Sequence, residues 1–258
     1  MISHKRRRSL LGLTVTATGL LLPKFALANS LNGARVVARI VLPGFSSAQP
    51  GGSFPVGWVH QTLPGVERPN HFELMRDNGQ TVLQVRSERS ASSLALAQRI
   101  DPAATPLLKW RWRVSNPVAG SDLRSKGGDD YAARIYVLFD LPTERLGMGD
   151  RMKIAAARML HGAEIPAAAL CYVWGNAQAA GESGWNPYTD RVRMIVVDSG
   201  AAHAGQWREQ VRDVAADFQA AFGDPVPPVS GIALGADTDN TGAQVETRFG
   251  DIFFEARP

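Results

Sequence analysis

Four aspartates in two short runs are the residues of this chain best suited to acid–base chemistry. Asp129 and Asp130 follow a Gly-Gly pair, while Asp237 and Asp239 follow an apolar run. Two carboxyl groups about 5 to 10 Å apart can act as the acid and base of glycosidic-bond cleavage. Loop aspartates also pair with arginines such as Arg134 for structural reasons alone. The four residues are therefore catalytic candidates, with a structural role as the alternative.

The run Asp-Thr-Asp-Asn-Thr-Gly that ends at Gly242 matches two known motifs in part. It resembles the nucleophile motif of aspartate-based phosphatases, but too few residues follow it to supply the rest of such an enzyme. It also resembles the first half of a calcium loop, although Arg248 stands where that loop needs a bidentate glutamate. A turn in which Asp and Asn side chains bond to the backbone explains the same residues. Calcium remains an alternative to that simple turn.

Several other catalytic classes lack the residues that they need. Cys171 is the single cysteine, so the sequence holds no intrachain disulfide and no multi-cysteine metal site. Residues 181–185 lack the last glycine of a serine nucleophile motif. The histidines have no zinc-ligand spacing, and no glycine-rich phosphate loop opens a helix. Serine-triad, zinc-hydrolase and nucleotide-binding functions therefore have little support.

Arginine and aromatic side chains alternate with apolar ones along several predicted strands. In residues 107–114, the two tryptophans share one face, and Lys109, Arg111 and Arg113 share the other. If such strands are neighbours, guanidinium groups and rings form a band suited to an acidic glycan. A solvated face crossed by salt bridges is an equal alternative. The predicted ligand-binding residues are Arg111, Arg113, Arg134, Tyr136, Tyr172, Trp174 and Arg193.

The elements that must position these residues are mostly short strands. The predicted strands are residues 35–42, 71–75, 81–87, 107–114, 132–139, 169–174, 191–198, 230–236 and 249–256. Asn78-Gly79 predicts a hairpin turn, because both residue types accept positive φ. Residues 150–160 and 205–222 predict helices, the second from an apolar stripe that runs from Trp207 to Phe222. The pattern favours a single mainly β sandwich over residues 29–258, with two helical connections.

Residues 1–28 have the organisation of an export signal. A basic run at residues 5–8 precedes a modest apolar stretch and Ala26-Leu27-Ala28, which matches an A-x-A cleavage site. Arg7 and Arg8 fit the twin-arginine pattern, with a chance pair in an ordinary signal peptide as the alternative. The apolar stretch is too short for a stable membrane anchor. We therefore expect a periplasmic or secreted protein.

The charge distribution argues against nucleic acid as a partner. The formal net charge is +4, but five of the 28 basic and none of the 24 acidic residues lie in residues 1–28. The rest of the chain therefore carries a net charge of −1, which gives no general attraction to phosphate backbones. Its lysines are Lys109, Lys126 and Lys153 alone. An acidic ligand would therefore meet mainly arginines.

Several separated motifs resemble one bacterial family. They are PLLKWRWRV at 106–114, KGGDD at 126–130, ARIY at 133–136, CYVW at 171–174, NPY at 186–188, RMIVV at 193–197, RDV at 212–214, DTDNTG at 237–242 and FGD at 249–251. In this order they are similar to exported proteins of the domain-of-unknown-function family 3047. The resemblance implies a jelly-roll sandwich similar to galactose-binding-like carbohydrate modules. Several such modules bind structural calcium where the first and last strands meet, which makes Asp251 a candidate ligand, although Ser46 stands where they often have an acid.

Two functions follow as expectations. The first is an exported β-sandwich module that binds carbohydrate, in particular an acidic glycan, through the arginine and aromatic residues. The alternative is a polysaccharide hydrolase or lyase that uses the loop aspartates. Fold resemblance alone does not decide between them.

Overall fold

The described part of the chain comprises residues 38–62, 65–149, 167–223 and 225–258 of a computed structural model. The predicted leader, residues 1–28, and the predicted helix at residues 150–160 lie outside these ranges. Within them, no helix is long and apolar enough to cross a membrane.

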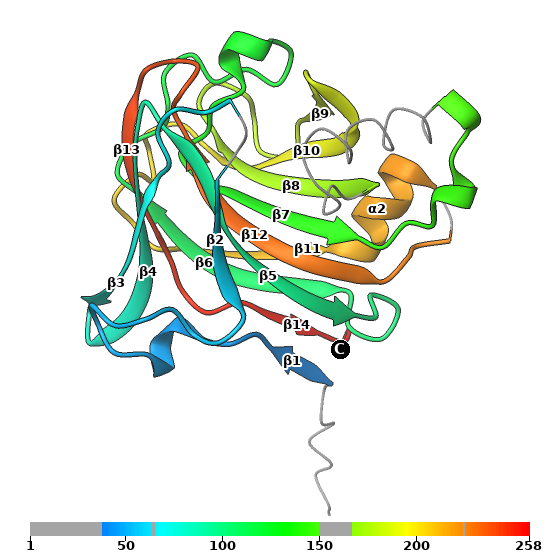
Figure 1. Cartoon of the computed structure of the whole chain (residues 1–258), viewed down its shortest axis with the longest axis horizontal. Coiled ribbons are helices and arrows are strands. Elements are labelled where there is room, and N and C mark those ends of the chain that lie inside the picture. Colours follow the sequence, from blue (N-terminus) through cyan, green and yellow to red (C-terminus); the bar gives the residue numbers. More distant parts are fainter. Residues whose placement is uncertain (1–37, 63–64, 150–166, 224) are drawn as a thin grey trace, which may run out of the picture. The chain divides into compact units, whose positions relative to one another are not determined.

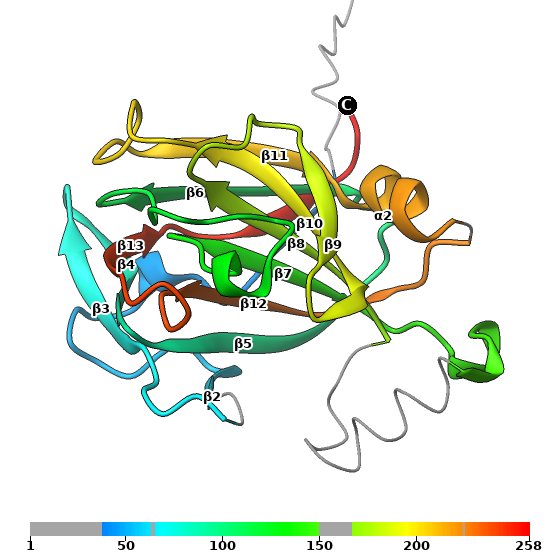
Figure 2. The same ribbon diagram turned by 90° about the horizontal axis from the view of Figure 1, so that it is seen from above.

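Two β-sheets of seven described strands each pack face to face (Figures 1 and 2). Sheet A contains, in spatial order, β1 (Arg39–Val41), β14 (Phe253–Glu255), β6 (Leu107–Val114), β13 (Gln244–Phe249), β4 (Gln80–Glu88) and β3 (His71–Asp77), with β11 (Arg208–Asp213) also paired to β6. Sheet B contains β2 (Trp58–Thr62), β5 (Ala91–Ile100), β12 (Val229–Asp237), β7 (Arg134–Phe139), β8 (Ala168–Gly175), β10 (Thr189–Ser199) and β9 (Ser183–Asn186). In Figure 2, β6 and β11 lie in the upper layer, and β5 and β12 in the lower one.

The helical elements whose bounds lie in the described residues are short connections. The α-helix α2 (Val214–Phe222) lies at one end of the sheets (Figure 1), and η1 (Phe45–Ser47), η2 (Lys126–Gly128) and η3 (Thr143–Arg145) are single 3₁₀ turns. The predicted mainly β sandwich of jelly-roll type is therefore confirmed.

Aromatic side chains from both sheets fill the core. On β6, Trp110 and Trp112 are buried, and the alternate residues Lys109, Arg111 and Arg113 are half-buried, as the alternation predicts. Trp110 stacks on Tyr172 of β8 with ring centroids 5.5 Å apart. Trp112 lies 6.1 Å from the ring of Trp174. Each buried indole removes roughly 200 Å² from water, which stabilises the fold by several kcal/mol at about 25 cal/mol per Å².

The helix predicted over residues 205–222 is wrong in its first half. Arg208–Asp213 forms β11, which pairs antiparallel with β6 and leaves Val211 54% exposed. The helix starts only at Val214, because the Asp213 carboxylate accepts a hydrogen bond of 3.0 Å from the Ala216 amide. Spacings of three and four residues at a strand-to-helix junction thus mimic one longer helix.

Two further comparisons concern strands and turns. The Asn78-Gly79 turn between β3 and β4 is confirmed, with φ values of 47° and 83°. The single strand predicted at residues 249–256 is wrong, because β13 ends at Phe249 and β14 starts at Phe253. Strands β2, β5, β9, β11 and most of β13 were not predicted.

Candidate functional site

The four candidate aspartates meet around Arg134 at one end of sheet B. Arg134 opens β7 and is 1% exposed. Its Nη2 donates to Oδ1 of Asp129 at 3.1 Å and to Oδ2 of Asp237 at 2.8 Å. Its Nη1 donates to the Tyr136 hydroxyl at 3.1 Å. We call Arg134 and the four aspartates the carboxylate cluster.

Further hydrogen bonds connect this cluster to the end of β9 and join its two acidic runs to each other. The Asn186 amide donates to Oδ2 of Asp129 at 2.8 Å. The buried carboxylate of Asp130 accepts from the backbone amide and from the hydroxyl of Thr241, both at 2.6 Å. Asp130 also accepts from the side-chain amide of Asn240 at 3.1 Å. The two acidic runs of the sequence are therefore parts of one junction.

One carboxyl group in the cluster titrates near neutral pH. Burial raises the pKa of Asp237 to about 7, and the negative charges of Asp129, Asp130 and Asp239 add to the rise, against the opposing effect of Arg134. Partial burial and the charge of Asp130 also raise the pKa of Asp239. Because Asp129 and Asp237 bond to the same nitrogen, their bonded oxygens lie within about 6 Å of each other on either side of the Arg134 guanidinium.

The seven predicted ligand-binding residues are not brought together. Arg111 and Arg113 lie on the outer face of sheet A, whereas Arg134 and Tyr136 lie on the outer face of sheet B. Tyr172 and Trp174 point into the core, because Tyr172 stands directly opposite the core residue Ile135 in the register of β7 and β8. Arg193 lies on β10, 5.2 Å from the ring of Trp185.

Salt bridges cross much of the outer face of sheet A. This matches the alternative interpretation of the sequence, a solvated face rather than a ligand-binding band of arginines and aromatic rings. Asp77 pairs with Arg113 at 3.3 Å and with Arg248 at 3.5 Å. Arg86 pairs with Glu73 at 2.8 Å. The exposed pair of Arg86 and Glu73 contributes about 0 to 1 kcal/mol, whereas the Asp77 side chain is only 8% exposed.

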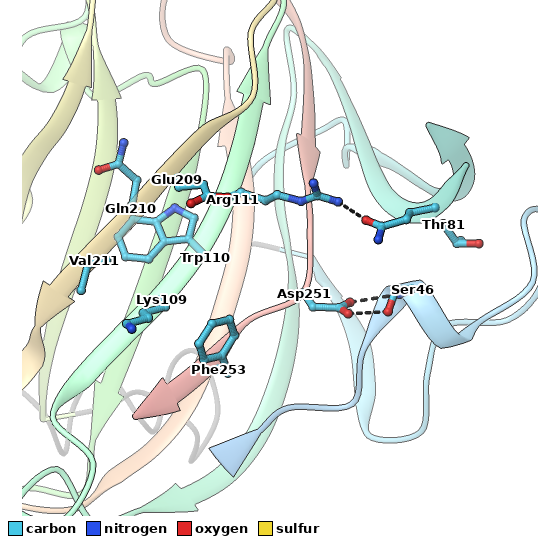
Figure 3. Close-up of a pocket in the computed structure, with 11 residues that line it drawn as sticks. Ser46, Thr81, Lys109, Trp110, Arg111, Glu209, Gln210, Val211, Asp251 and Phe253 are labelled. Carbon is cyan, nitrogen blue, oxygen red and sulfur yellow. Dashed lines mark hydrogen bonds between the residues drawn. The ribbon is translucent and has the colours of Figure 1, made fainter. Parts of the chain in front are cut away.

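A groove of about 340 Å³ opens beside this charged face (Figure 3). Strands β6, β11 and β14, the start of β4, the β13–β14 bend and η1 surround it. The lining residues are Ser46, Gln80, Thr81, Lys109, Trp110, Arg111, Glu209, Gln210, Val211, Asp251 and Phe253. We call it the sheet A groove.

Arg111 extends across this groove (Figure 3). It donates a hydrogen bond to the side-chain oxygen of Gln80. Its guanidinium carbon lies 4.7 Å from the ring centroid of Trp207. Lys109 and Arg113 form ion pairs with acidic side chains, whereas Arg111 forms none with the residues described. Among the residues described, the guanidinium of Arg111 therefore contacts the neutral side chains of Gln80 and Trp207 and forms no ion pair.

Asp251, the residue predicted to bind calcium, lines the same groove. Its Oδ1 accepts a hydrogen bond of 3.0 Å from the amide of Ser46, and its Oδ2 accepts from the Ser46 hydroxyl (Figure 3). Calcium takes six to eight oxygen ligands, but the described residues contain no group of three or more acidic, histidine or cysteine side chains that could share an ion. Calcium at Asp251 therefore stays a prediction from the family resemblance.

Several groove residues were missed by the sequence reasoning. Glu209 and Val211 fell inside the helix predicted at residues 205–222, so their position beside β6 was hidden. The same is true of Trp207, which contacts the groove residue Arg111. Phe253 was placed inside one continuous strand rather than after a bend. The alternation of residue types over Arg208–Asp213 could have predicted a strand there, and with it the position of Glu209 and Val211.

The motifs on which the family resemblance rests contribute to both places. KGGDD, ARIY and DTDNTG supply the carboxylate cluster, and Asn186 of NPY donates a hydrogen bond to it. PLLKWRWRV and FGD line the sheet A groove. A family model described as protein of unknown function (DUF3047) matches residues 56–253. The chain belongs to this family. No curated protein matches the chain.

Solved structures with a similar arrangement come from proteins that act on or bind carbohydrate. The family 30 carbohydrate-binding module of the cellulosomal cellulase Cel9D-Cel44B of Clostridium thermocellum is 11% identical, with a TM-score of 0.40 over 83% of this chain and 97% of that one. The family 12 endoglucanase 3 of Trichoderma harzianum is 10% identical, with a TM-score of 0.42 over 86% and 99%. A family 12 xyloglucanase of Bacillus licheniformis is 8% identical, with a TM-score of 0.45 over 85% and 100%. The function of this DUF3047 chain must be argued from its own side chains.

Proposed function

We propose that this chain is exported to the periplasm or secreted and binds an acidic glycan in the sheet A groove. The observation that carries the proposal is Arg111, which lies in the groove without an ion-pair partner among the described residues. A guanidinium binds a carboxylate through two parallel hydrogen bonds. Val211 and Phe253 add apolar surface beside it. The groove volume also lies in the usual range of roughly 300 to 1,000 Å³ for small-ligand sites.

Calorimetric titration with short oligogalacturonides tests this site. Arg111→Ala is expected to weaken binding at least ten-fold, because one charged hydrogen-bonded contact is worth about 1.5 to 3 kcal/mol. Arg111→Lys keeps the charge but loses the fork, so it should recover only part of the affinity. Arg86→Ala removes a paired arginine from the same sheet outside the groove and serves as the control. Equal affinity in wild type and Arg111→Ala would overturn the groove assignment.

Export is part of the same proposal and rests on the leader sequence. Replacing Arg7 and Arg8 by lysine should hold the precursor in the cytoplasm if the twin-arginine route is used. Cell fractionation with an antibody to the folded domain measures this. Unchanged export of the double variant would point to the general secretory route.

A second candidate function, glycan cleavage at the carboxylate cluster, is favoured by one observation. Burial raises the pKa of Asp237 to about 7, which suits a general acid, and Asp129 lies beside it on the same nitrogen of Arg134. Incubation with polysaccharides, followed by assays for new reducing ends and for unsaturated products, tests it. Activity that Asp237→Asn abolishes and Asp140→Asn preserves would establish this function. Absence of products across acidic and neutral glycans would exclude it for those substrates.

A further inference from the structure

The side chains that line the sheet A groove carry charges of both signs. Lys109 and Arg111 are its basic residues, and Glu209 and Asp251 are its acidic residues. These formal charges cancel, so the lining as a whole has no excess of positive charge to attract a ligand that is only negative. Charge complementarity therefore favours a ligand that carries both signs.

Two of these four groups are already bonded within the protein. The ammonium of Lys109 forms an ion pair with Glu255, and both side chains are less than half exposed. The Asp251 carboxylate accepts hydrogen bonds from the amide and the hydroxyl of Ser46. A ligand would have to break these contacts to use either group. The charges that remain available in the groove are those of Arg111 and Glu209.

Glu209 lies directly opposite Arg111 in the register of β11 and β6, but the two side chains do not pair. Residues in such positions have Cβ atoms about 5 Å apart, close enough for opposite charges to meet. Figure 3 shows that the Arg111 side chain runs away from Glu209 and toward Thr81. Within the described ranges, none of the basic side chains forms an ion pair with Glu209, which is exposed. The groove thus offers a cation and an anion that do not neutralise each other.

The two groups make opposite demands on a ligand. The Arg111 guanidinium has only donors and suits a carboxylate, whereas the ionised carboxyl of Glu209 has only acceptors and suits an ammonium group. A glycan with carboxylates alone would place negative charge beside Glu209, which is unfavourable. A protonated amine on the same glycan would remove this repulsion and donate hydrogen bonds to Glu209.

On the basis of the glycan-binding function proposed above, we propose that the ligand of the sheet A groove is zwitterionic. Its carboxylate lies on Arg111, and a protonated amine of an amino sugar without an N-acetyl group lies on Glu209. Because the two residues start from opposite positions on neighbouring strands, the two charges belong on the same sugar unit or on adjacent ones. A uronic acid linked to a de-N-acetylated amino sugar meets this requirement.

Calorimetric titration with a matched pair of ligands tests the amine. The probes are a tetrasaccharide of alternating glucuronic acid and glucosamine with free amines, and the same tetrasaccharide after N-acetylation. At about pH 6 the free amine is protonated and the carboxylate is ionised. The free-amine form is expected to bind at least ten-fold more tightly than the N-acetylated form, because only an amine can pair with Glu209.

Matched variants assign this preference to one residue. Glu209→Gln keeps the size of the side chain and should bind the two forms with equal affinity. Glu88→Gln makes the same change at an exposed glutamate of β4 outside the groove, and should keep the ten-fold preference. Arg111→Ala should weaken both forms to a similar extent, because both carry the carboxylate.

The outcomes separate the amine from the groove itself. If wild type binds both forms equally and Arg111→Ala weakens both, the amine assignment is wrong and the groove function stands. A preference for the free amine that persists in Glu209→Gln would overturn the role of Glu209. Failure of wild type to bind either form would overturn the groove function and the amine assignment together.

Discussion

Gly250 lies against the side chain of Arg111 so closely that a Cβ at residue 250 would fall 2.6 Å from Nε and 2.7 Å from Cγ of the arginine. The Gly250 amide also donates to the Arg111 carbonyl at 3.0 Å. The bend between β13 and β14 therefore leaves space for an arginine to cross the sheet into the groove.

The first prediction is that Gly250→Ala displaces Arg111. Backbone strain is not the cause, because the φ of Gly250 is not in the positive range. Binding of oligogalacturonide should weaken about as much as in Arg111→Ala, and the free energy of unfolding should fall by about 1 to 3 kcal/mol from overpacking. Gly127→Ala, where a Cβ meets no atom within 4 Å, is the control for both calorimetry and urea unfolding. Full affinity in Gly250→Ala would show that Arg111 does not need its observed path.

The second prediction concerns Asp237 and pH. In the unfolded chain its pKa is about 4, and in the folded protein it is about 7. Between these values the folded state holds a proton that the unfolded state has lost, so this group makes the free energy of unfolding fall as pH rises from about 4 to about 7. Urea unfolding across that range should show the decline relative to Asp237→Asn. Parallel curves for the two proteins would contradict the raised pKa.

The third prediction concerns Asp130 as a structural junction. Asp130→Ala leaves the amide and hydroxyl of Thr241 without their acceptor, so we expect a loss of about 2 to 4 kcal/mol in the free energy of unfolding. Asp140→Ala removes a carboxylate that is 57% exposed and pairs with Arg99, and should cost less than about 1 kcal/mol. Similar losses in the two variants would mean that the loops are held by other contacts.

The fourth prediction is that Tyr172 stabilises the fold and does not bind the ligand. Its hydroxyl donates to Oδ2 of Asp217 at 2.7 Å inside the sandwich. Tyr172→Phe should therefore lower the free energy of unfolding by about 1 to 2 kcal/mol and leave glycan affinity unchanged. A large loss of affinity at unchanged stability would restore the ligand-binding role that the sequence suggested.

The fold class could be predicted from the sequence because the alternation of residue types along a strand shows which side chains share a face. On β6, the alternation of tryptophan with basic residues assigned the inner and outer sides correctly. The same local parity grouped Tyr172 with Trp174 but did not say which side of the sheet they occupy. That depends on register with β7, where Ile135 stands opposite Tyr172. Register between separate strands is a property of the assembled sheet.

The candidate sites show the same division. The four aspartates were recognised by type, and in the structure two of them, Asp129 and Asp237, bond to Arg134. Their catalytic role stays a prediction. The sheet A groove was out of reach, because it depends on β11 lying beside β6 and on the bend at Gly250.

The place of β14 in sheet A has a consequence for the time at which the protein can fold. This last strand of the chain lies between β1, the first described strand, and β6. The hydrogen-bond ladder of sheet A is therefore incomplete until Phe253–Glu255 has been synthesised, and the core residue Phe254 arrives with it. A transport route that accepts only folded proteins would therefore meet this chain only after Phe253–Glu255 has been synthesised and has paired with β1 and β6.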